Sequence, residues 1–172
     1  MSDKVAIITR TKDRQVLLPR AVLSVINQTY SDWIHVIVND GGCSEVVEQS
    51  VAAHRKAYGD RLKILHHKES TGMQSASNVG IAVCESTYLV IHDDDDSWEP
   101  GYLEACVGYL KNAGPQSRYQ GVIAHTERIY EETDNHGQPI EKYREDHIPL
   151  DQVSLFRAGF ENPFAPIAFL FR

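Results

Sequence analysis

A short apolar segment that runs directly into four aspartates is the feature that most constrains this chain. Residues 88–91 (YLVI) are aromatic, branched or large and apolar, which is typical of a strand buried on both faces, and residues 93–96 are all aspartate. Carboxylates 4 Å apart repel by roughly 1 kcal/mol per pair in water, and by several times that where solvent is partly excluded. The segment therefore needs compensation for its charge.

A hard divalent cation would relieve this repulsion, because Mg²⁺ and Mn²⁺ prefer oxygen ligands and share their shell with phosphate. The alternative is a solvated acidic turn that caps the next helix, since aspartate suits both turns and helix starts. The position at the end of a buried strand favours the metal, because open α/β sheets bind their ligands there.

Strand-like and helix-like segments alternate along the chain. We expect strands at 5–9, 33–38, 62–65 and 88–91, and helices from Leu18 onward, from a Ser44 N-cap to about Tyr58, at 75–83, and from Pro100 to about Asn112. This order predicts βαβ units and a mostly parallel sheet. Four polar segments then meet at one sheet edge, namely 9–11, 39–41, 66–72 and 93–96, and we expect them to bind a polar anion of about nucleotide size.

Composition excludes several other classes. The 172 residues predict one globular domain, and a net charge of -7 argues against a nucleic-acid partner. Three widely spaced cysteines predict reduced thiols and no disulfide or zinc site. There is no signal-peptide pattern and no apolar run long enough to span a bilayer. We therefore expect a cytoplasmic protein, with a peripheral position at the inner face of a membrane as the alternative.

The motifs of several nucleotide-binding classes are missing. No GxGxxG follows the first strand, and no GxxxxGK[ST] occurs. A receiver domain would carry an acidic pair directly after that strand, where this chain has Thr9, Arg10 and Thr11. A sugar-nucleotide nucleotidyltransferase would carry a glycine-rich loop there, and this loop has no glycine.

Four segments carry a more specific pattern in their order and spacing: VAIITRTKDRQVLLPRAVLSVINQTYSDWIHVIVNDGG, ESTGMQSASNVGIAVCESTYLVIHDDDD, DDDDSWEPGYL and HTERIYEETDNHGQPI. Together they resemble the inverting family 2 glycosyltransferases, and DDDDSWEP resembles the family's metal-holding D-x-D-D-x-W-x-P run. The resemblance implies the GT-A fold, a Rossmann-like three-layer α/β/α domain with a mostly parallel sheet, here C-terminally truncated. Residues 1–100 would form the nucleotide-binding half and 101–172 the start of the acceptor-side half.

The resemblance also implies roles for residues of the first half. Thr9 and Arg10 match the loop under the base and ribose, although Arg10 could equally be a surface charge. Asp40 matches the carboxylate that accepts a hydrogen bond from the base, typically uracil N3–H. The alternative for Asp40 is an Asx turn before Gly41. Asn78 belongs to the donor-binding segment before the acidic motif. The family's arginine before this asparagine is replaced by Ser77, so its contact would be missing or supplied elsewhere, for example by Lys68.

Within the acidic run, Asp93 matches the first aspartate of D-x-D, near the ribose and sugar. Asp95 matches the second, which ligates the Mn²⁺ or Mg²⁺ that bridges the diphosphate. Asp94 and Asp96 are expected either to support the metal-binding residues without touching the metal or to cap the next helix. Asp94 is also predicted to be a substrate-binding residue. His92 is expected to be a packed, hydrogen-bonded histidine.

The implied reaction transfers a sugar from a nucleotide-diphosphate sugar, by expectation a UDP-sugar, to a glycan or other hydroxyl acceptor with inversion. The family's catalytic base lies downstream of the strand that PIAFLFR resembles, so no catalytic residue is assigned; Asp146 and Asp151 come too early in the order. The alternative is a catalytically incomplete nucleotide-sugar-binding module that acts as a scaffold or partner subunit. An apolar final strand also predicts an unpaired sheet edge, and through it a homo-oligomer.

Overall fold

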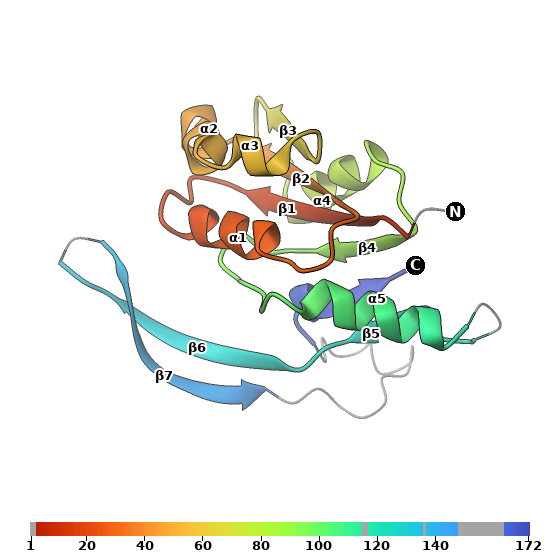
Figure 1. Cartoon of the computed structure of the whole chain (residues 1–172). Coiled ribbons are helices and arrows are strands. Elements are labelled where there is room, and N and C mark those ends of the chain that lie inside the picture. Colours follow the sequence, from red (N-terminus) through yellow and green to blue (C-terminus); the bar gives the residue numbers. More distant parts are fainter. Residues whose placement is uncertain (1–2, 115–116, 136, 148–163) are drawn as a thin grey trace.

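A computed structural model describes residues 3–114, 117–135, 137–147 and 164–172 (Figure 1). The strands are β1 (Val5–Thr11), β2 (Trp33–Asp40), β3 (Leu62–His67), β4 (Tyr88–Ile91), β5 (Gly121–Ile123), β6 (Thr126–Thr133), β7 (Pro139–His147) and β8 (Phe169–Phe171). The helices are α1 (Leu17–Ile26), α2 (Ser44–Ala52), α3 (Arg55–Tyr58), α4 (Met73–Ala82), α5 (Tyr102–Asn112) and the short 3₁₀ turn η1 (Pro166–Ala168).

The central sheet has the strand order β3-β2-β1-β4-β8-β5. The first four strands in sequence are parallel to one another, as the alternating pattern predicts, whereas β8 is antiparallel to both β4 and β5. The sheet is therefore mixed but mostly parallel.

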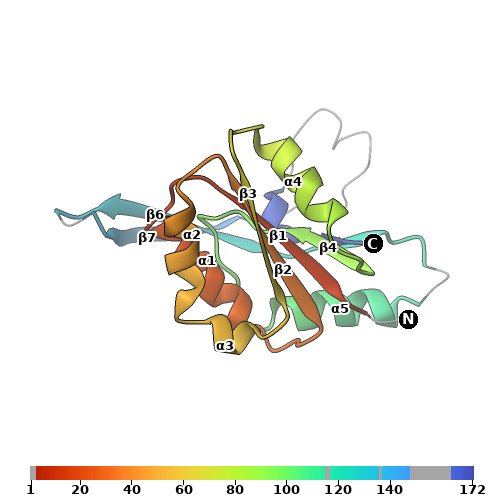
Figure 2. The ribbon, with the colours of Figure 1, turned by 90° about the horizontal axis from the view of Figure 1, so that it is seen from above.

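Helices cover both faces of the sheet and give the expected three layers. Helices α1, α2 and α3 lie on one face and α4 on the other (Figure 2). On the first face Leu18 and Val22 of α1 and Val107 of α5 share one core cluster with the strands. On the other face α4 packs very closely, because a Cβ at Gly80 would come within 2.6 Å of Ile8 Cγ2. Glycine at this position lets α4 lie close against β1 and β2.

The final strand does not form the unpaired edge expected from the sequence. Residue Leu170 of β8 pairs with Val90 on one side and Val122 on the other, and its side chain is fully buried. The expectation was wrong because a later strand of the chain can insert between earlier ones, which local pattern does not reveal. Oligomerisation through an open β8 edge is therefore not expected.

Several boundaries also differ from expectation. The helix expected from Ser44 to Tyr58 is divided into α2 and α3, and the N-cap of α2 is Cys43. The last helix begins at Tyr102, two residues after Pro100, whose carbonyl instead accepts a hydrogen bond from the Thr29 N–H at 2.9 Å. The three cysteines are free thiols. Within the described ranges, no helix is long and apolar enough to cross a membrane.

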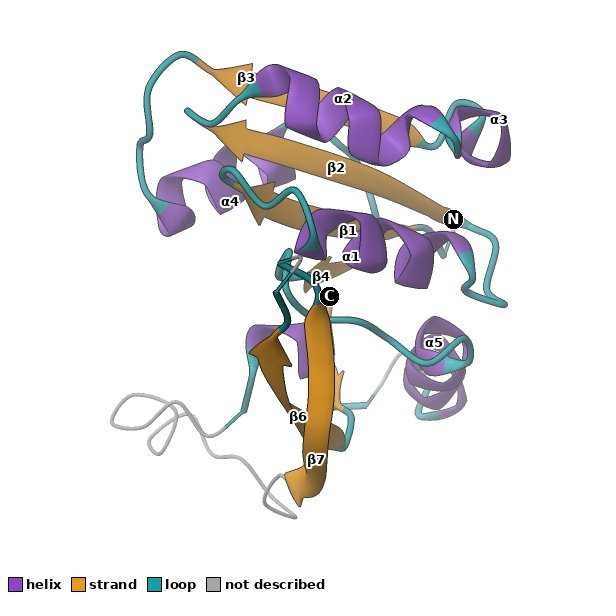
Figure 3. Ribbon diagram, turned by 90° about the vertical axis from the view of Figure 1, so that its left-hand side faces the viewer, coloured by secondary structure: helices purple, strands orange, loops and turns teal. Residues whose placement is uncertain are grey.

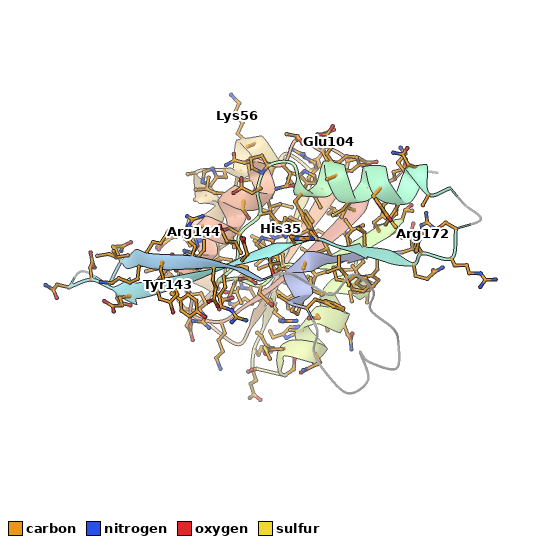
Figure 4. The ribbon with its side chains drawn as sticks, turned by 90° about the horizontal axis from the view of Figure 1, so that it is seen from below. His35, Lys56, Glu104, Tyr143, Arg144 and Arg172 are labelled. Atoms are coloured by element: carbon orange, nitrogen blue, oxygen red, sulfur yellow. The ribbon has the colours of Figure 1, made fainter. Side chains whose placement is uncertain are left out.

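Strands β6 and β7 form a separate two-stranded ribbon that extends away from the central sheet (Figures 1 and 3). The pairing is antiparallel, with a register shift between Tyr130 and Glu131. Tyr130 stacks on Tyr143 with ring centroids 4.2 Å apart, and Tyr143 and Arg144 project from the ribbon in Figure 4.

Candidate functional site

The carboxyl ends of β1, β2 and β4 meet at a cavity of about 460 Å³, at the sheet edge that the sequence predicts. Its walls are formed by Arg10, Thr11, Lys12, Arg14, Asp40, Ser70, Gly72, Met73, Asp93, Asp94 and Asp95. Three carboxylates from the acidic run thus share a cavity with three cations from the end of β1. This distribution of charge suits a ligand that brings both negative charge and a bound cation.

Arg10 is held on this wall by contacts from two other elements. Its Nη2 lies 2.5 Å from Asp93 Oδ1, and its Nη1 donates to Ser77 Oγ of α4 at 3.0 Å. The Arg10 side chain is 17% exposed, so it is not the free surface charge that the sequence left open. Lys68, which the sequence suggested as a replacement for the family's missing arginine, is exposed and does not line the cavity. The guanidinium that contacts Ser77 is that of Arg10, on β1.

Asp94 is also buried and Asp96 is half-buried. Burial raises the pKa of Asp94, and Arg14, whose Nε lies 3.8 Å from Asp94 Oδ1, opposes that shift. Burial, together with the negative charges of Asp95 and Asp93, raises the pKa of Asp96 to about 6. In both groups burial disfavours the charged carboxylate, and a cation bound nearby would favour it.

The donor set fits a metal that binds together with a phosphate ligand. Within the described residues, no three or more His, Cys, Asp or Glu side chains converge as a ready-made cage. Mg²⁺-type sites commonly use only one or two carboxylates, with substrate phosphates and water completing the shell. Asp95 suits this role because its side chain is 49% exposed and the Arg14 Nη2 that pairs with its carboxylate is 3.9 Å away.

The segment behind the aspartates is fixed by aromatic packing. His92 is fully buried, its Nε2 lies 3.0 Å from Ser24 Oγ, and its ring meets that of Trp98 edge-on at 4.3 Å. The Trp98 indole N–H donates to the Ile167 carbonyl at 3.0 Å. The expectation of a packed, hydrogen-bonded histidine is confirmed, and the tryptophan ties the acidic loop to the turn that leads into β8.

The carboxylate of Asp40, at the end of β2, accepts several hydrogen bonds. It accepts hydrogen bonds from the N–H groups of Thr71 (2.8 Å) and Gly72 (2.9 Å) and from the Ser70 hydroxyl (2.7 Å), and His67 Nδ1 lies 3.0 Å away. Burial alone would raise the pKa of Asp40, but the bonds from Thr71, Ser70 and His67 outweigh it and hold the pKa well below its usual range. Asp40 therefore anchors the connection between β3 and α4.

The turn after Asp40 is shaped by its neighbours. The side-chain bond that closes the turn is accepted by Asn39 Oδ1 from the Gly42 N–H at 3.0 Å, so the Asx-type turn belongs to Asn39. Gly41 has φ +78°, and a Cβ there would lie 2.4 Å from Ser70 N. Glycine is required at this position because the backbone at Ser70 approaches so closely.

Two residues of the expected site do not line the cavity. Thr9 is fully buried, and its hydroxyl lies 2.9 Å from Nε2 of His35 in the interior (Figure 4). Successive residues of a strand face opposite sides, so Thr9 points toward the α1 and α2 face while Arg10 points toward α4. Asn78 is exposed on α4, one residue beyond the buried Ser77.

Other residues on the cavity wall were not singled out from the sequence. Lys12 and Arg14 follow the polar segment 9–11 that the sequence predicts at this edge, and their position in the same loop at a strand end was the available signal. Met73 is 59% exposed at the start of α4 and gives the cavity an apolar wall. No local pattern marks such a methionine.

Comparison with known proteins agrees with this architecture. The family model described as "Glycosyl transferase family 2" matches residues 6–163. The chain therefore belongs to family 2 of the glycosyltransferases, an enzyme family, and its fold is the GT-A fold seen in its structural neighbours.

The matched proteins are longer than this chain. A GalNAc(5)-diNAcBac-PP-undecaprenol beta-1,3-glucosyltransferase of Campylobacter jejuni is 32% identical over 58% of this chain and 32% of its own length. TarS 1-349 of S. aureus, solved with UDP, has a TM-score of 0.58 at 19% identity over 63% of this chain and 32% of its own. The mannosyltransferase PcManGT of Pyrobaculum calidifontis, solved with GDP-Man and Mn²⁺, has a TM-score of 0.59 at 18% identity over 70% and 34%. The chain thus spans about a third of these proteins.

Proposed function

We propose that this chain binds a nucleotide-diphosphate sugar, with a UDP-sugar as the expected donor, and belongs to an enzyme that transfers the sugar to an acceptor hydroxyl with inversion and the help of Mn²⁺ or Mg²⁺. The observation that carries the proposal is the cavity of about 460 Å³ in which Asp93, Asp94 and Asp95 lie with Arg10, Lys12 and Arg14. Its size falls within the range of roughly 300–1,000 Å³ that is usual for small-molecule sites.

Each wall of the cavity has a role in this proposal. Asp40 and the Ser70–Gly72 segment that it anchors line the cavity. In this proposal they bind the nucleobase of the donor. Arg10 and Arg14 balance the charge of the diphosphate, Asp93 lies near the ribose and sugar, and Asp95 ligates the metal. When bound, the metal supplies Lewis-acid stabilisation of the leaving diphosphate. The side chains contribute by positioning and by electrostatics arranged in advance of the reaction.

Solved neighbours support the choice of ligand. TarS 1-349 was solved with UDP and with UDP-GlcNAc, and PcManGT with GDP-Man and Mn²⁺. At identities below 20%, the likeness to these neighbours shows a shared fold alone. The expectation of a uracil base in the donor is inferred separately, from Asp40.

The second candidate is a binding module that does not transfer sugar by itself. The carboxylates on the cavity wall are either in the acidic run or, for Asp40, saturated by hydrogen bonds, so none that the structure describes there is free to act as a base. Asp146 lies on β7 and off that wall. Asp151 and Glu161 lie outside the described residues. Binding without efficient transfer is the behaviour expected of this chain alone.

The test is a panel of nucleotide sugars examined by thermal shift with and without Mn²⁺, followed by detection of hydrolysis or transfer for those that bind. Ligand stabilisation is about 2.7 kcal/mol at a hundredfold excess over the dissociation constant. We expect UDP-sugars to stabilise the protein most, and more so with Mn²⁺. Stabilisation by none of the panel would refute the donor site, whereas binding with no hydrolysis or transfer would favour the module.

A further inference from the structure

Arg20, on α1, contacts two segments that are far apart in sequence. Its Nη2 donates to the backbone carbonyl of Asp95 at 2.8 Å, and its Nη1 lies 2.6 Å from Glu131 Oε1 on β6. The planar guanidinium suits this double contact because its terminal nitrogens donate in fixed, diverging directions. Arg20 therefore links the acidic loop after β4 to the β6–β7 ribbon.

The contact to Asp95 matters because little else fixes this residue. Its carboxylate is half exposed, and the Arg14 guanidinium that approaches it is 3.9 Å away, too far for a hydrogen bond. The 2.8 Å bond to its carbonyl is the closer restraint. A backbone held at this point sets the direction in which the Asp95 side chain leaves the loop.

The contact to Glu131 joins α1 to the β6–β7 ribbon. The register of β6 and β7 shifts between Tyr130 and Glu131, where β7 carries Lys142 as the extra residue, and such a bulge increases the local twist of the two strands. The Glu131 side chain is only 25% exposed because it lies against Arg20. A two-stranded hairpin is marginally stable alone, so a contact to the body of the protein helps fix where the ribbon lies.

We propose that Arg20 is a positioning residue that couples the β6–β7 ribbon to Asp95, so that metal-linked binding of the donor depends on the ribbon. The inference rests on the proposed function, because Asp95 is taken as the metal ligand. Arg20 does not line the cavity and acts only through the loop and Glu131.

Calorimetric titration of UDP with and without Mn²⁺ tests the coupling in the full 172-residue chain. Arg20→Met should reduce the Mn²⁺-dependent gain in UDP affinity by about tenfold, the lower end of the loss typical for groups that orient a metal ligand. Metal-free UDP affinity should change little. Glu131→Gln should reduce the gain in the same direction but by less, and Arg20→Lys, which keeps the charge without the fork, should lie between wild type and Arg20→Met.

Arg128→Met is the matched control. Arg128 lies on the same ribbon and pairs with Glu145 at 3.3 Å, but that pair does not contact the acidic loop. It should leave the Mn²⁺-dependent gain unchanged. The double variant Arg20→Met/Glu131→Gln should lose no more than Arg20→Met alone, because the two side chains act through one linkage.

A full Mn²⁺-dependent gain in Arg20→Met would overturn the coupling, as would additive losses in the double variant. Absence of any gain in the wild type would instead overturn the proposed function. If Arg20→Met does not fold, Glu131→Gln carries the test through amide hydrogen exchange of residues 93–98 in metal-free buffer. Faster exchange than in Arg128→Met supports the coupling, and equal exchange refutes it.

Discussion

Asp40 combines two properties that bear on donor binding. It is on the cavity wall, and its carboxylate already accepts hydrogen bonds from Ser70, Thr71 and Gly72. Whether it meets the base directly or through the segment it holds, its loss should affect the nucleoside end of the ligand and spare the phosphates. Loss of Asp40 should therefore change the affinity for UDP and leave the affinity for free pyrophosphate nearly unchanged.

Asp40→Ala should weaken UDP binding by roughly 1.5–3 kcal/mol, the range for a hydrogen bond to a charged group. Affinity for free pyrophosphate should hardly change, because Arg10, Arg14 and the acidic run remain. Titration of both ligands against wild type and variant provides the measurement. Equal losses for UDP and pyrophosphate would show that Asp40 supports the fold or the phosphates and does not read the base.

His35 provides a residue-scale test of the core. It is fully buried between the hydroxyls of Thr9 (2.9 Å) and Tyr58 (2.8 Å), and burial, with a smaller contribution from His92, holds its pKa well below the usual value. The folded protein therefore keeps this ring neutral at pH values where the unfolded chain, with a pKa near 6.5, takes up a proton. Stability must then fall as the pH drops below about 6.5.

For this histidine the fall should approach 1.4 kcal/mol per pH unit below the unfolded pKa. His35→Gln should show a shallower pH dependence between pH 6.5 and 5, with His125→Gln, an exposed site, as the control. Urea unfolding at several pH values measures both. Identical slopes for wild type and His35→Gln would mean that His35 is protonated in the folded state.

At the scale of elements, the positions of strands β1 to β4 were predictable, and so was the sheet edge at which the cavity lies. Their apolar runs are local signals, and parallel packing brings their carboxyl ends together. The placement of β8 between β4 and β5 was not predictable, because pairing between segments far apart in sequence leaves no local pattern.

The site was predictable to the same degree. The cavity is lined by Arg10, Asp40 and residues 93–95, all of which belong to the predicted polar segments. Thr9 does not line it, because the alternation of side chains along β1 points Thr9 into the core beside His35. Arg20 was missed because its two partners, Asp95 and Glu131, lie far from it in the chain. Contacts of this kind depend on tertiary structure alone.

The turn between β2 and α2 supplies a prediction at this scale. Gly41 and Gly59 both have positive φ, at +78° and +56°, but a Cβ at Gly41 would meet the backbone of Ser70 whereas one at Gly59 would meet nothing within 4 Å. Both alanine variants should carry the backbone strain that a positive φ imposes on an L residue, on the order of 1–3 kcal/mol. Only Gly41→Ala should lose more than this, because it also displaces the segment that Asp40 holds.

Urea unfolding of Gly41→Ala and Gly59→Ala measures this difference. Gly41→Ala should also weaken UDP binding, since Ser70 and Gly72 line the cavity. Equal destabilisation by the two substitutions would contradict the close approach of Ser70 to Gly41.

At the scale of the whole molecule, this chain spans about a third of its longer relatives. None of the carboxylates that the structure describes on the cavity wall is free to act as a general base. We therefore expect the 172-residue chain to bind a nucleotide diphosphate yet transfer sugar very slowly, because loss of a general base typically lowers the rate about 10²–10⁴-fold.

The comparison uses a longer version of the natural reading frame, if one exists, with the same UDP-sugar and acceptor mixture. Rapid turnover by the short chain would contradict the expectation and place a base within these residues. Asp146, Asp151 and Glu161 would then be the first carboxylates to substitute.

The central claim is that the acidic run binds a metal together with the diphosphate, and Asp95→Asn tests it most directly by calorimetric titration of UDP with and without Mn²⁺. Wild type should bind UDP more tightly with Mn²⁺, and Asp95→Asn should abolish most of that gain. In metal-free buffer the variant should be as stable as wild type or more so, because it relieves repulsion among the aspartates. A variant that keeps the full Mn²⁺-dependent gain in UDP affinity would contradict the account.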